Sequence, residues 1–222
     1  MKKPLSTRTK ILINVGVVIG VAVMIAVVVF ATRTPTPPSP TGSASAPQVL
    51  RENSHRLSTA ADGKVTVVEF LDFECEACGA VYPVVEDLRE EFDGEVTFVT
   101  RYFPIPSHTN AVNSAVAAEA AARQGQFEAM YSKLFETQTQ WGEQPESRAD
   151  LFRTYAEDIG LDLELYDADI QDPAVLERVM EDQREGTALG VQGTPTFFLN
   201  GEQLELSTLE AFRAAIEGAV RE

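Results

Sequence analysis

The chain has 222 residues, of which 44% are hydrophobic and 23% charged, and these values suit one globular domain with appended segments. The formal net charge is −16. The first 33 positions hold five basic residues and no acidic one, which leaves the rest of the chain at −21. Nucleic-acid binding needs a basic surface, so this charge argues against a nucleic-acid partner.

Cys75 and Cys78 are the two cysteines of the sequence. One pair is too few for a disulfide-stapled scaffold, and a domain of this size does not need one. A closed zinc site usually takes four Cys or His ligands. Only His55 and His108 could add to the pair, and they are far apart in the sequence. We therefore expect no metal site.

The N-terminus predicts a membrane anchor. Residues 11–31 are almost entirely apolar and, at about 1.5 Å per residue, reach roughly 30 Å, the thickness of a bilayer core. Four basic residues precede them, so residues 1–10 should form a cytoplasmic tail with the rest of the chain outside the cell membrane. A cleaved signal peptide is the alternative, although its apolar region is usually about 7–15 residues long.

Residues 32–62 form a linker and lead-in. The stretch is rich in Pro, Ser and Thr, which cannot build a core and favour an extended tether. We expect an edge strand around residues 55–57. From residue 63 onward, apolar runs predict strands at 65–73, 95–102 and 196–199 and helices at 76–92 and 208–220. Residues 109–190 are predicted to be helical almost throughout.

The Cys75–Cys78 spacing at a strand-to-helix junction predicts thiol–disulfide chemistry. Unpaired N–H groups at the helix start favour the thiolate of Cys75, which makes it the nucleophile. Cys78 lies one turn later on the same side and would resolve a mixed disulfide. The alternative is a structural disulfide, but a loop this short stabilises a fold little.

Glu69 is a candidate proton relay. It lies six residues before Cys75 in the predicted strand, so the two share a face. Burial would raise the pKa of its carboxyl and let it exchange a proton with Cys78. The alternative is an ordinary solvated carboxylate.

Three segments of the sequence belong together. They are Val-Glu-Phe-Leu-Asp-Phe-Glu-Cys-Glu-Ala-Cys at 68–78, Arg-Tyr-Phe-Pro at 101–104 and Gly-Thr-Pro-Thr-Phe-Phe-Leu-Asn-Gly at 193–201. Taken together, they resemble the DsbA-like branch of the thioredoxin superfamily. The resemblance implies an α/β thioredoxin fold over residues 63–222, a central mixed sheet flanked by helices, with a helical insertion at about 107–190. It also implies a thiol–disulfide oxidoreductase with a redox-active disulfide and no other cofactor.

The resemblance further implies a cis bond at Thr194–Pro195 packed on Cys75, with the Thr194 backbone binding a substrate peptide, and a proton-relay role for an acid at position 69. His108 could lie near the active site or cap the next helix, and we favour the cap. The best-known pattern, Cys-Pro-His-Cys, is replaced here by Glu76 and Ala77 between the cysteines. The charge of Glu76 should raise the pKa of Cys75. We therefore expect a potential more reducing than the roughly −120 mV of DsbA.

The leading functional hypothesis is an extracytoplasmic oxidase of cysteines in secreted or cell-envelope proteins. Its partner would be a quinone-linked membrane protein that reoxidises it. The alternative is a reductase or isomerase of envelope disulfides, regenerated by an electron donor. A non-catalytic interaction domain with vestigial cysteines is the third hypothesis.

Overall fold

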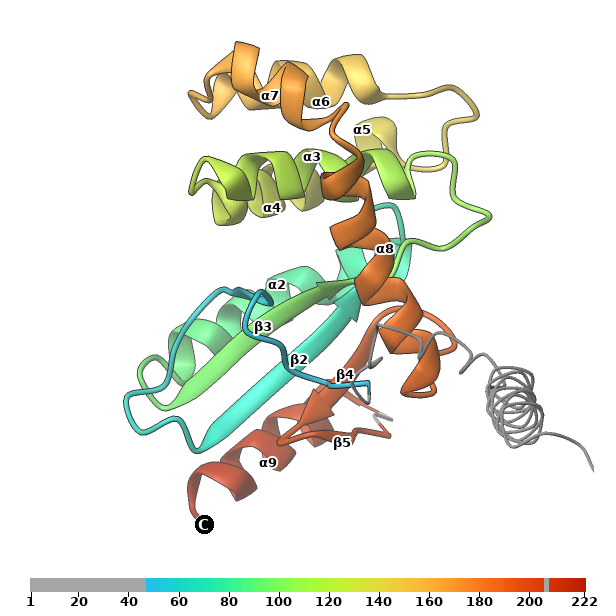
Figure 1. The fold of residues 1–222 in the computed structure, drawn as a ribbon. Coiled ribbons are helices and arrows are strands. Elements are labelled where there is room, and N and C mark those ends of the chain that lie inside the picture. The colour runs from blue at the N-terminus through green and yellow to red at the C-terminus, as the bar shows by residue number, and fades with distance from the viewer. Residues whose placement is uncertain (1–46, 206–207) are drawn as a thin grey trace, which may run out of the picture. The chain divides into compact units, whose positions relative to one another are not determined.

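Two parallel strands form the centre of a mixed five-stranded sheet in the computed structural model, which describes residues 47–205 and 208–222 (Figure 1). The strands lie in the order β1-β3-β2-β4-β5, and the pairs other than β2–β3 are antiparallel. They are β1 (His55–Arg56), β2 (Val65–Leu71), β3 (Val96–Tyr102), β4 (Thr196–Leu199) and β5 (Glu202–Gln203). The mixed sheet of the predicted thioredoxin fold is confirmed.

The strands follow the apolar runs, with small differences at their ends. Every residue of β2 except Thr66 is buried, as expected for a strand covered on both faces. β2 ends at Leu71 and not at residue 73, because Asp72 starts a turn in which its carbonyl accepts from the N–H of Cys75. Asn200 and Gly201 both have positive φ, at 50° and 88°, and make the tight turn between β4 and β5.

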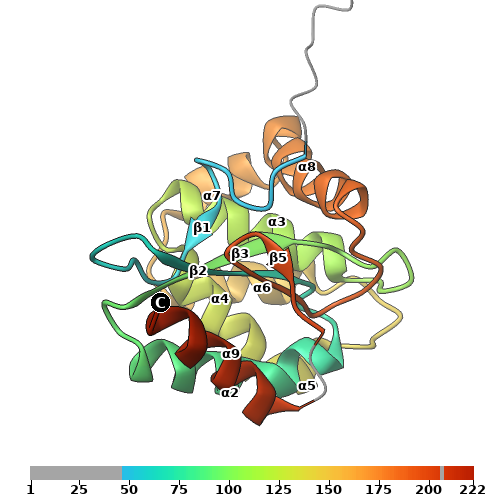
Figure 2. The same ribbon diagram turned by 90° about the horizontal axis from the view of Figure 1, so that it is seen from below.

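Helices cover both faces of the sheet (Figure 2). α2 (Glu76–Glu91) and α9 (Leu209–Val220) lie on one face, and α8 (Pro173–Ala188) lies on the other. Val67 and Leu71 of β2 pack toward the first pair, together with Leu88 of α2 and Phe212 of α9. Successive side chains of a strand point to opposite faces of the sheet. Val68 and Phe70 of β2 therefore belong to a second apolar cluster, on the opposite face.

The predicted helical insertion is confirmed. It comprises α3 (Ala111–Arg123), α4 (Phe127–Glu136), α5 (Gln138–Trp141), α6 (Ala149–Asp158), α7 (Leu163–Asp169) and α8. Helices α3 to α7 gather beyond the carboxyl ends of β2 and β3, where α2 begins (Figure 1). Fully buried aromatic side chains, including Tyr131, Trp141 and Phe152, hold them together. The insertion therefore overhangs the end of the sheet that carries the cysteines.

The lead-in before residue 63 is part of the folded unit. β1 pairs with β3 through His55 and Arg56, so it is an edge strand of the sheet. Fully buried Arg101 of β3 donates to the carbonyl of Gln48 and forms ion pairs with Asp182 and Glu185 of α8. Residues 47–56 are thereby attached to both the sheet and α8.

The structure leaves the predicted membrane anchor untested. Within residues 47–205 and 208–222, every helix is too short or too polar to cross a bilayer. The expected tail at 1–10, the expected anchor at 11–31 and the linker up to residue 46 lie outside the described residues.

Candidate active site

Cys75 stands at the junction of the sheet and α2. It is the N-cap residue of α2, with φ −68° and ψ 120°, and its thiol is partly exposed. Cys78 lies one turn into the helix and is fully buried. Both cysteines are free thiols in this structure. A substrate sulfur can therefore reach Cys75 but not Cys78.

The Thr194–Pro195 peptide lies against Cys75, although 119 residues separate them in the sequence. The bond is cis, as the resemblance implied. The Cys75 Sγ lies 3.3 Å from the Thr194 carbonyl oxygen, which accepts a hydrogen bond from the thiol when Cys75 is protonated. The Cys75–Cys78 segment and the Thr194–Pro195 segment thus form one site.

The pKa of the Cys75 thiol is lowered to about 5. The main cause is the hydrogen bond from the Cys78 thiol, and the backbone N–H groups of Ala77 and Cys78 act in the same direction. Burial opposes them. Glu76, which we expected to raise this pKa, is exposed and is not among the main causes. Cys75 therefore carries a thiolate at neutral pH, the form that attacks disulfides.

Glu69 and Cys78 form a buried proton-bearing pair behind Cys75. Burial raises the pKa of Glu69 to about 8, and the negative charges of Glu86 and Cys75 add to the effect. Burial also raises the pKa of Cys78, as do Cys75 and the charge of Glu69. Glu69 is 4% exposed, so the alternative of a solvated carboxylate is wrong. Its carboxyl holds a proton near neutral pH and stands close enough to Cys78 to influence its ionisation.

We expected His108 to cap the helix that follows it, and this prediction is wrong. The N-cap residue of α3 is Asn110, and the His108 Nδ1 lies 2.8 Å from the Asp72 Oδ2. The buried Asp72 carboxylate also accepts from the N–H groups of Glu74 and Ile105. Burial raises the pKa of Asp72, and these hydrogen bonds oppose the rise. The contact between His108 and Asp72 joins the turn before Cys75 to the loop after β3.

The sequence did not reveal three further residues around Cys75. The Gln138 Nε2 donates to the carbonyls of Phe73 and Cys75, at 2.8 Å each. The buried Glu74 accepts from the backbone N–H groups of Asn110 and Glu143. Gly79 leaves room for Gln138, since a Cβ there would lie 2.1 Å from its Oε1. A glycine one turn after Cys75 in a helix was the one available signal.

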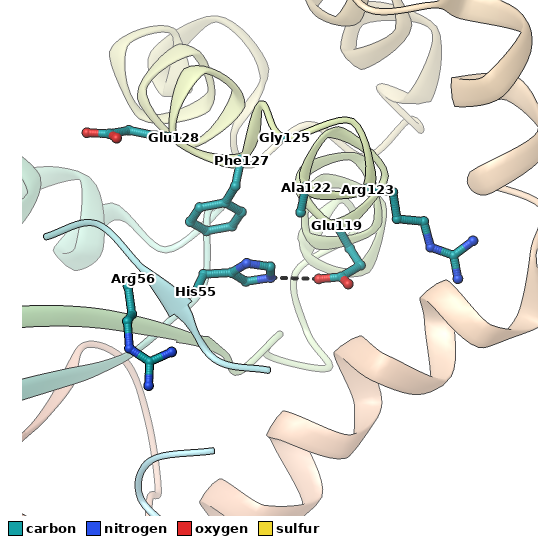
Figure 3. Close-up of a pocket in the computed structure, with 8 residues that line it drawn as sticks. All are labelled: His55, Arg56, Glu119, Ala122, Arg123, Gly125, Phe127 and Glu128. Atoms are coloured by element: carbon teal, nitrogen blue, oxygen red, sulfur yellow. Dashed lines mark hydrogen bonds and ion pairs between the residues drawn. The ribbon is translucent and has the colours of Figure 1, made fainter. Parts of the chain in front are cut away.

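Away from the cysteines, a cavity of about 370 Å³ lies between β1 and the insertion (Figure 3). The His55 ring stacks on Phe127 with ring centroids 3.9 Å apart, and its Nε2 lies 2.7 Å from the Glu119 Oε2. The Tyr102 hydroxyl donates to the same oxygen. His55 and His108 thus contact different carboxylates. Across the residues that the structure describes, no group of three or more His, Cys, Asp or Glu side chains could hold a metal ion.

Comparisons with known proteins identify the family and the fold of the chain. A family model described as thioredoxin matches residues 56–218. The chain is similar to a crystal structure of a thioredoxin-like oxidoreductase from Silicibacter pomeroyi, with 25% identity, a TM-score of 0.65 and coverage of 80% of this chain and 98% of the other. It also shares its fold with alpha-DsbA1 of Wolbachia pipientis, with 16% identity, a TM-score of 0.68 and coverage of 78% and 93%.

One curated relative is named as an antiporter and not as a thioredoxin. The chain is 35% identical over 147 residues to a protein of Mycobacterium sp. strain KMS named Na(+)/H(+) antiporter NhaA 1. The match covers 64% of this chain but only 23% of the antiporter. The family model, by contrast, covers most of the chain. The chain therefore belongs to the thioredoxin family, and its fold is that of the DsbA-like thiol–disulfide oxidoreductases.

Proposed function

We propose that this protein exchanges disulfides with cysteine-containing proteins through Cys75 and Cys78. The observation that carries the proposal is the partly exposed Cys75 thiol, with a pKa of about 5, facing the Thr194 carbonyl while Cys78 is buried one turn away. The antiporter name carries no weight here, because this chain matches less than a quarter of those proteins.

As an oxidase, the protein would begin with a Cys75–Cys78 disulfide. A substrate thiolate attacks the Cys75 sulfur, the bond between the cysteines breaks, and Cys78 leaves as a thiolate that takes a proton from Glu69. A second substrate thiolate then attacks the substrate sulfur of the mixed disulfide, and Cys75 leaves as a thiolate. The substrate gains a disulfide, and two electrons pass to the protein.

The low pKa of Cys75 favours this direction. A stabilised thiolate stabilises the reduced protein and makes the disulfide a better oxidant. A value of about 5 lies between roughly 3.5 for DsbA and roughly 7 for thioredoxin. We therefore propose a potential between the roughly −120 mV and −270 mV of those proteins. The reductase alternative corresponds to the lower end of this range, and the isomerase alternative to a potential of about −180 mV within it.

We further propose that the site works outside the cell membrane. The apolar run at residues 11–31, the basic residues before it and the proline-rich tether after it support this location. Substrates would be secreted or cell-envelope proteins. If the protein is an oxidase, a quinone-linked membrane partner would reoxidise it. If it is a reductase, an electron donor would reduce it.

Two assays on the same preparation separate the directions. The oxidised protein should speed the refolding of a reduced, disulfide-containing substrate at stoichiometric amounts. The reduced protein should act weakly in insulin reduction with dithiothreitol. Strong insulin reduction without oxidative refolding would favour the reductase. Failure of both assays, with Cys75→Ser behaving like the native protein, would support the non-catalytic hypothesis.

A further inference from the structure

The hydroxyl groups of Thr100 and Tyr131 are buried and have no hydrogen-bond partner among the residues that the structure describes. Thr100 belongs to β3 and is 1% exposed, and Tyr131 belongs to α4 and is 0% exposed. A buried polar group without a partner costs free energy. A role in catalysis or a bound water is a common explanation for such a group in a native fold.

Both hydroxyls lie on the face of the sheet that Glu69 occupies. Glu69 of β2 and Thr100 of β3 are direct partners in the parallel pairing of these strands. Two residues farther along, Leu71 and Tyr102 are also partners, and they pack into the apolar cluster on the α2 face. Side chains alternate along a strand, so Glu69 and Thr100 point to the same face. Tyr131 of the insertion packs into this cluster as well.

The charge of Glu69 also acts on the Tyr131 hydroxyl. Burial raises the pKa of Tyr131 well above its usual value, and the charge of Glu69 is the next cause of that rise. The Glu69 carboxyl therefore has one unpartnered hydroxyl near it from the neighbouring strand and another from the insertion.

The proposed oxidation turns Glu69 into a buried anion. When Cys78 leaves as a thiolate, it takes the proton of the Glu69 carboxyl, so the sulfur becomes neutral and the negative charge moves to the carboxylate. Burial and the negative charges of Glu86 and Cys75 raise the pKa of Glu69 and thus oppose this charge. A buried carboxylate is costly unless hydrogen-bond donors compensate it.

We propose that the hydroxyls of Thr100 and Tyr131 donate hydrogen bonds to the Glu69 carboxylate after its proton has passed to Cys78, directly or through one ordered water. This inference rests on the proposed function, which is where the proton transfer occurs. A hydroxyl suits both states of Glu69, because it donates to the carboxylate and accepts from the protonated acid. The bond to the charged form is the stronger one, so the two hydroxyls favour ionisation. Thr100 and Tyr131 act through Glu69 and are positioning residues.

The ionisation of Glu69 must be separated from that of its neighbours. The main other titratable side chains that act on Glu69 or Tyr131, or respond to them, are in α2 or at its N-cap: Cys75, Cys78, Tyr82, Glu86 and Arg89. A full-length Cys75→Ser, Cys78→Ser background removes both thiols, and the other three side chains are the same in every protein compared. Infrared spectra recorded against pH follow the band of the protonated carboxyl, which is assigned to Glu69 by its loss in Glu69→Gln.

Tyr131→Phe and Thr100→Val each remove a hydroxyl with little change of shape. Each should raise the titration midpoint of Glu69 by about one pH unit, which is a tenfold change in its ionisation, because a donor to the charged form is lost. The matched control is Tyr155→Phe in α6, whose hydroxyl is also buried and without a partner in the described part of the chain. The control should leave the midpoint unchanged.

The reaction provides a second readout in the native cysteine background. Tyr131→Phe should shift the pH profile of mixed-disulfide decay by the same amount as the midpoint, and it should have no effect when Glu69→Gln is already present. An unchanged midpoint in both hydroxyl variants would overturn the inference, as would an equal shift in Tyr155→Phe. If the midpoints shift as expected but the native protein exchanges no disulfides, the donor role of the hydroxyls stands and the proposed function fails.

Discussion

Gln138 donates a hydrogen bond from its Nε2 to the carbonyl oxygen of Cys75, at 2.8 Å. The contact joins the helical insertion to the backbone of the proposed nucleophile across 63 residues of sequence. It depends on Gly79, because the Gln138 side chain occupies the space that a Cβ at position 79 would need. The glycine and the glutamine are therefore coupled.

The substitution Gly79→Ala tests this coupling. In an open helix it should stabilise by up to about 1 kcal/mol. Here the Cβ displaces the Gln138 amide and breaks two hydrogen bonds of about 0.5–1.5 kcal/mol each, so we expect a net loss in the free energy of unfolding. The measurement is urea unfolding.

The control for this experiment is Gly218→Ala in α9, where a Cβ meets nothing within 4 Å. That substitution should stabilise. In the Gln138→Ala background, Gly79→Ala should also become stabilising. An equal cost of Gly79→Ala in both backgrounds would contradict the coupling.

The ionisation of Cys75 gives a pH-dependent signal. The absorbance of its thiolate near 240 nm should titrate with a midpoint near pH 5 in the reduced protein. Because the folded pKa is below the unfolded value of about 8.5, the thiolate stabilises the reduced protein above pH 8.5. This stabilisation is lost as the pH falls through 5.

The variant Cys78→Ala should raise the pKa of Cys75, since the Cys78 thiol is the main cause of the shift. Alkylation by iodoacetamide provides an independent readout, with its rate falling about tenfold per pH unit below the midpoint. A midpoint above pH 8 in the native protein would refute the geometry described for the thiolate.

Glu69 should have the opposite effect on stability. Its folded pKa of about 8 exceeds the unfolded value of 4.5. Below pH 4.5 the carboxyl is protonated in both states and costs no stability. As the pH rises through 8, the buried carboxyl ionises in the folded protein and stability is lost. In a Cys75→Ser, Cys78→Ser background, Glu69→Gln should match the parent at pH 4.5 and be more stable than it at pH 9.

In the intact cysteine background, Glu69→Gln should slow the step in which Cys78 leaves or attacks, because Gln cannot pass a proton. Stopped-flow decay of a mixed disulfide at pH 7 measures that step. A variant with parental stability at both pH values and a parental rate would show that Glu69 has neither role.

Arg101 tests the attachment of α8 to the sheet. Its guanidinium is fully buried and forms an ion pair with the fully buried Asp182. Arg101→Met leaves that carboxylate with less compensation and should cost about 3–5 kcal/mol in the free energy of unfolding. The control Arg153→Met breaks the exposed pair with Asp167 and should have little effect. An equally small loss of stability in Arg101→Met and in Arg153→Met would contradict this account of the Arg101–Asp182 pair.

Much of the fold follows from local patterns in the sequence. Apolar runs marked β2, β3 and β4, and Asn200-Gly201 marked the turn after β4, because a turn of this kind favours residues that adopt positive φ. The Cys75–Cys78 pair and Thr194–Pro195 were also visible. Their contact was not visible from spacing alone, and the resemblance to a known family supplied it.

The missed residues act through contacts distant in sequence. Gln138 and Glu74 are polar residues with no motif of their own, and their importance comes from burial against backbone groups of other segments. His108 was misassigned for the same reason. Its partner Asp72 is 36 residues away at the end of a strand, while a cap on the nearby helix is a local interaction. Periodicity reports which face a residue occupies, but not what it meets there.

Trapping the mixed disulfide tests the central claim, that Cys75 is the attacking thiol and Cys78 the resolving thiol. Cys78→Ala and Cys75→Ala are each reduced, mixed with a peptide disulfide at pH 7 and examined by intact-mass spectrometry. The account predicts a stable adduct on Cys75 in Cys78→Ala and none in Cys75→Ala, whose remaining thiol is buried and protonated. Adducts formed at equal rates in both variants, or in Cys75→Ala alone, would contradict it.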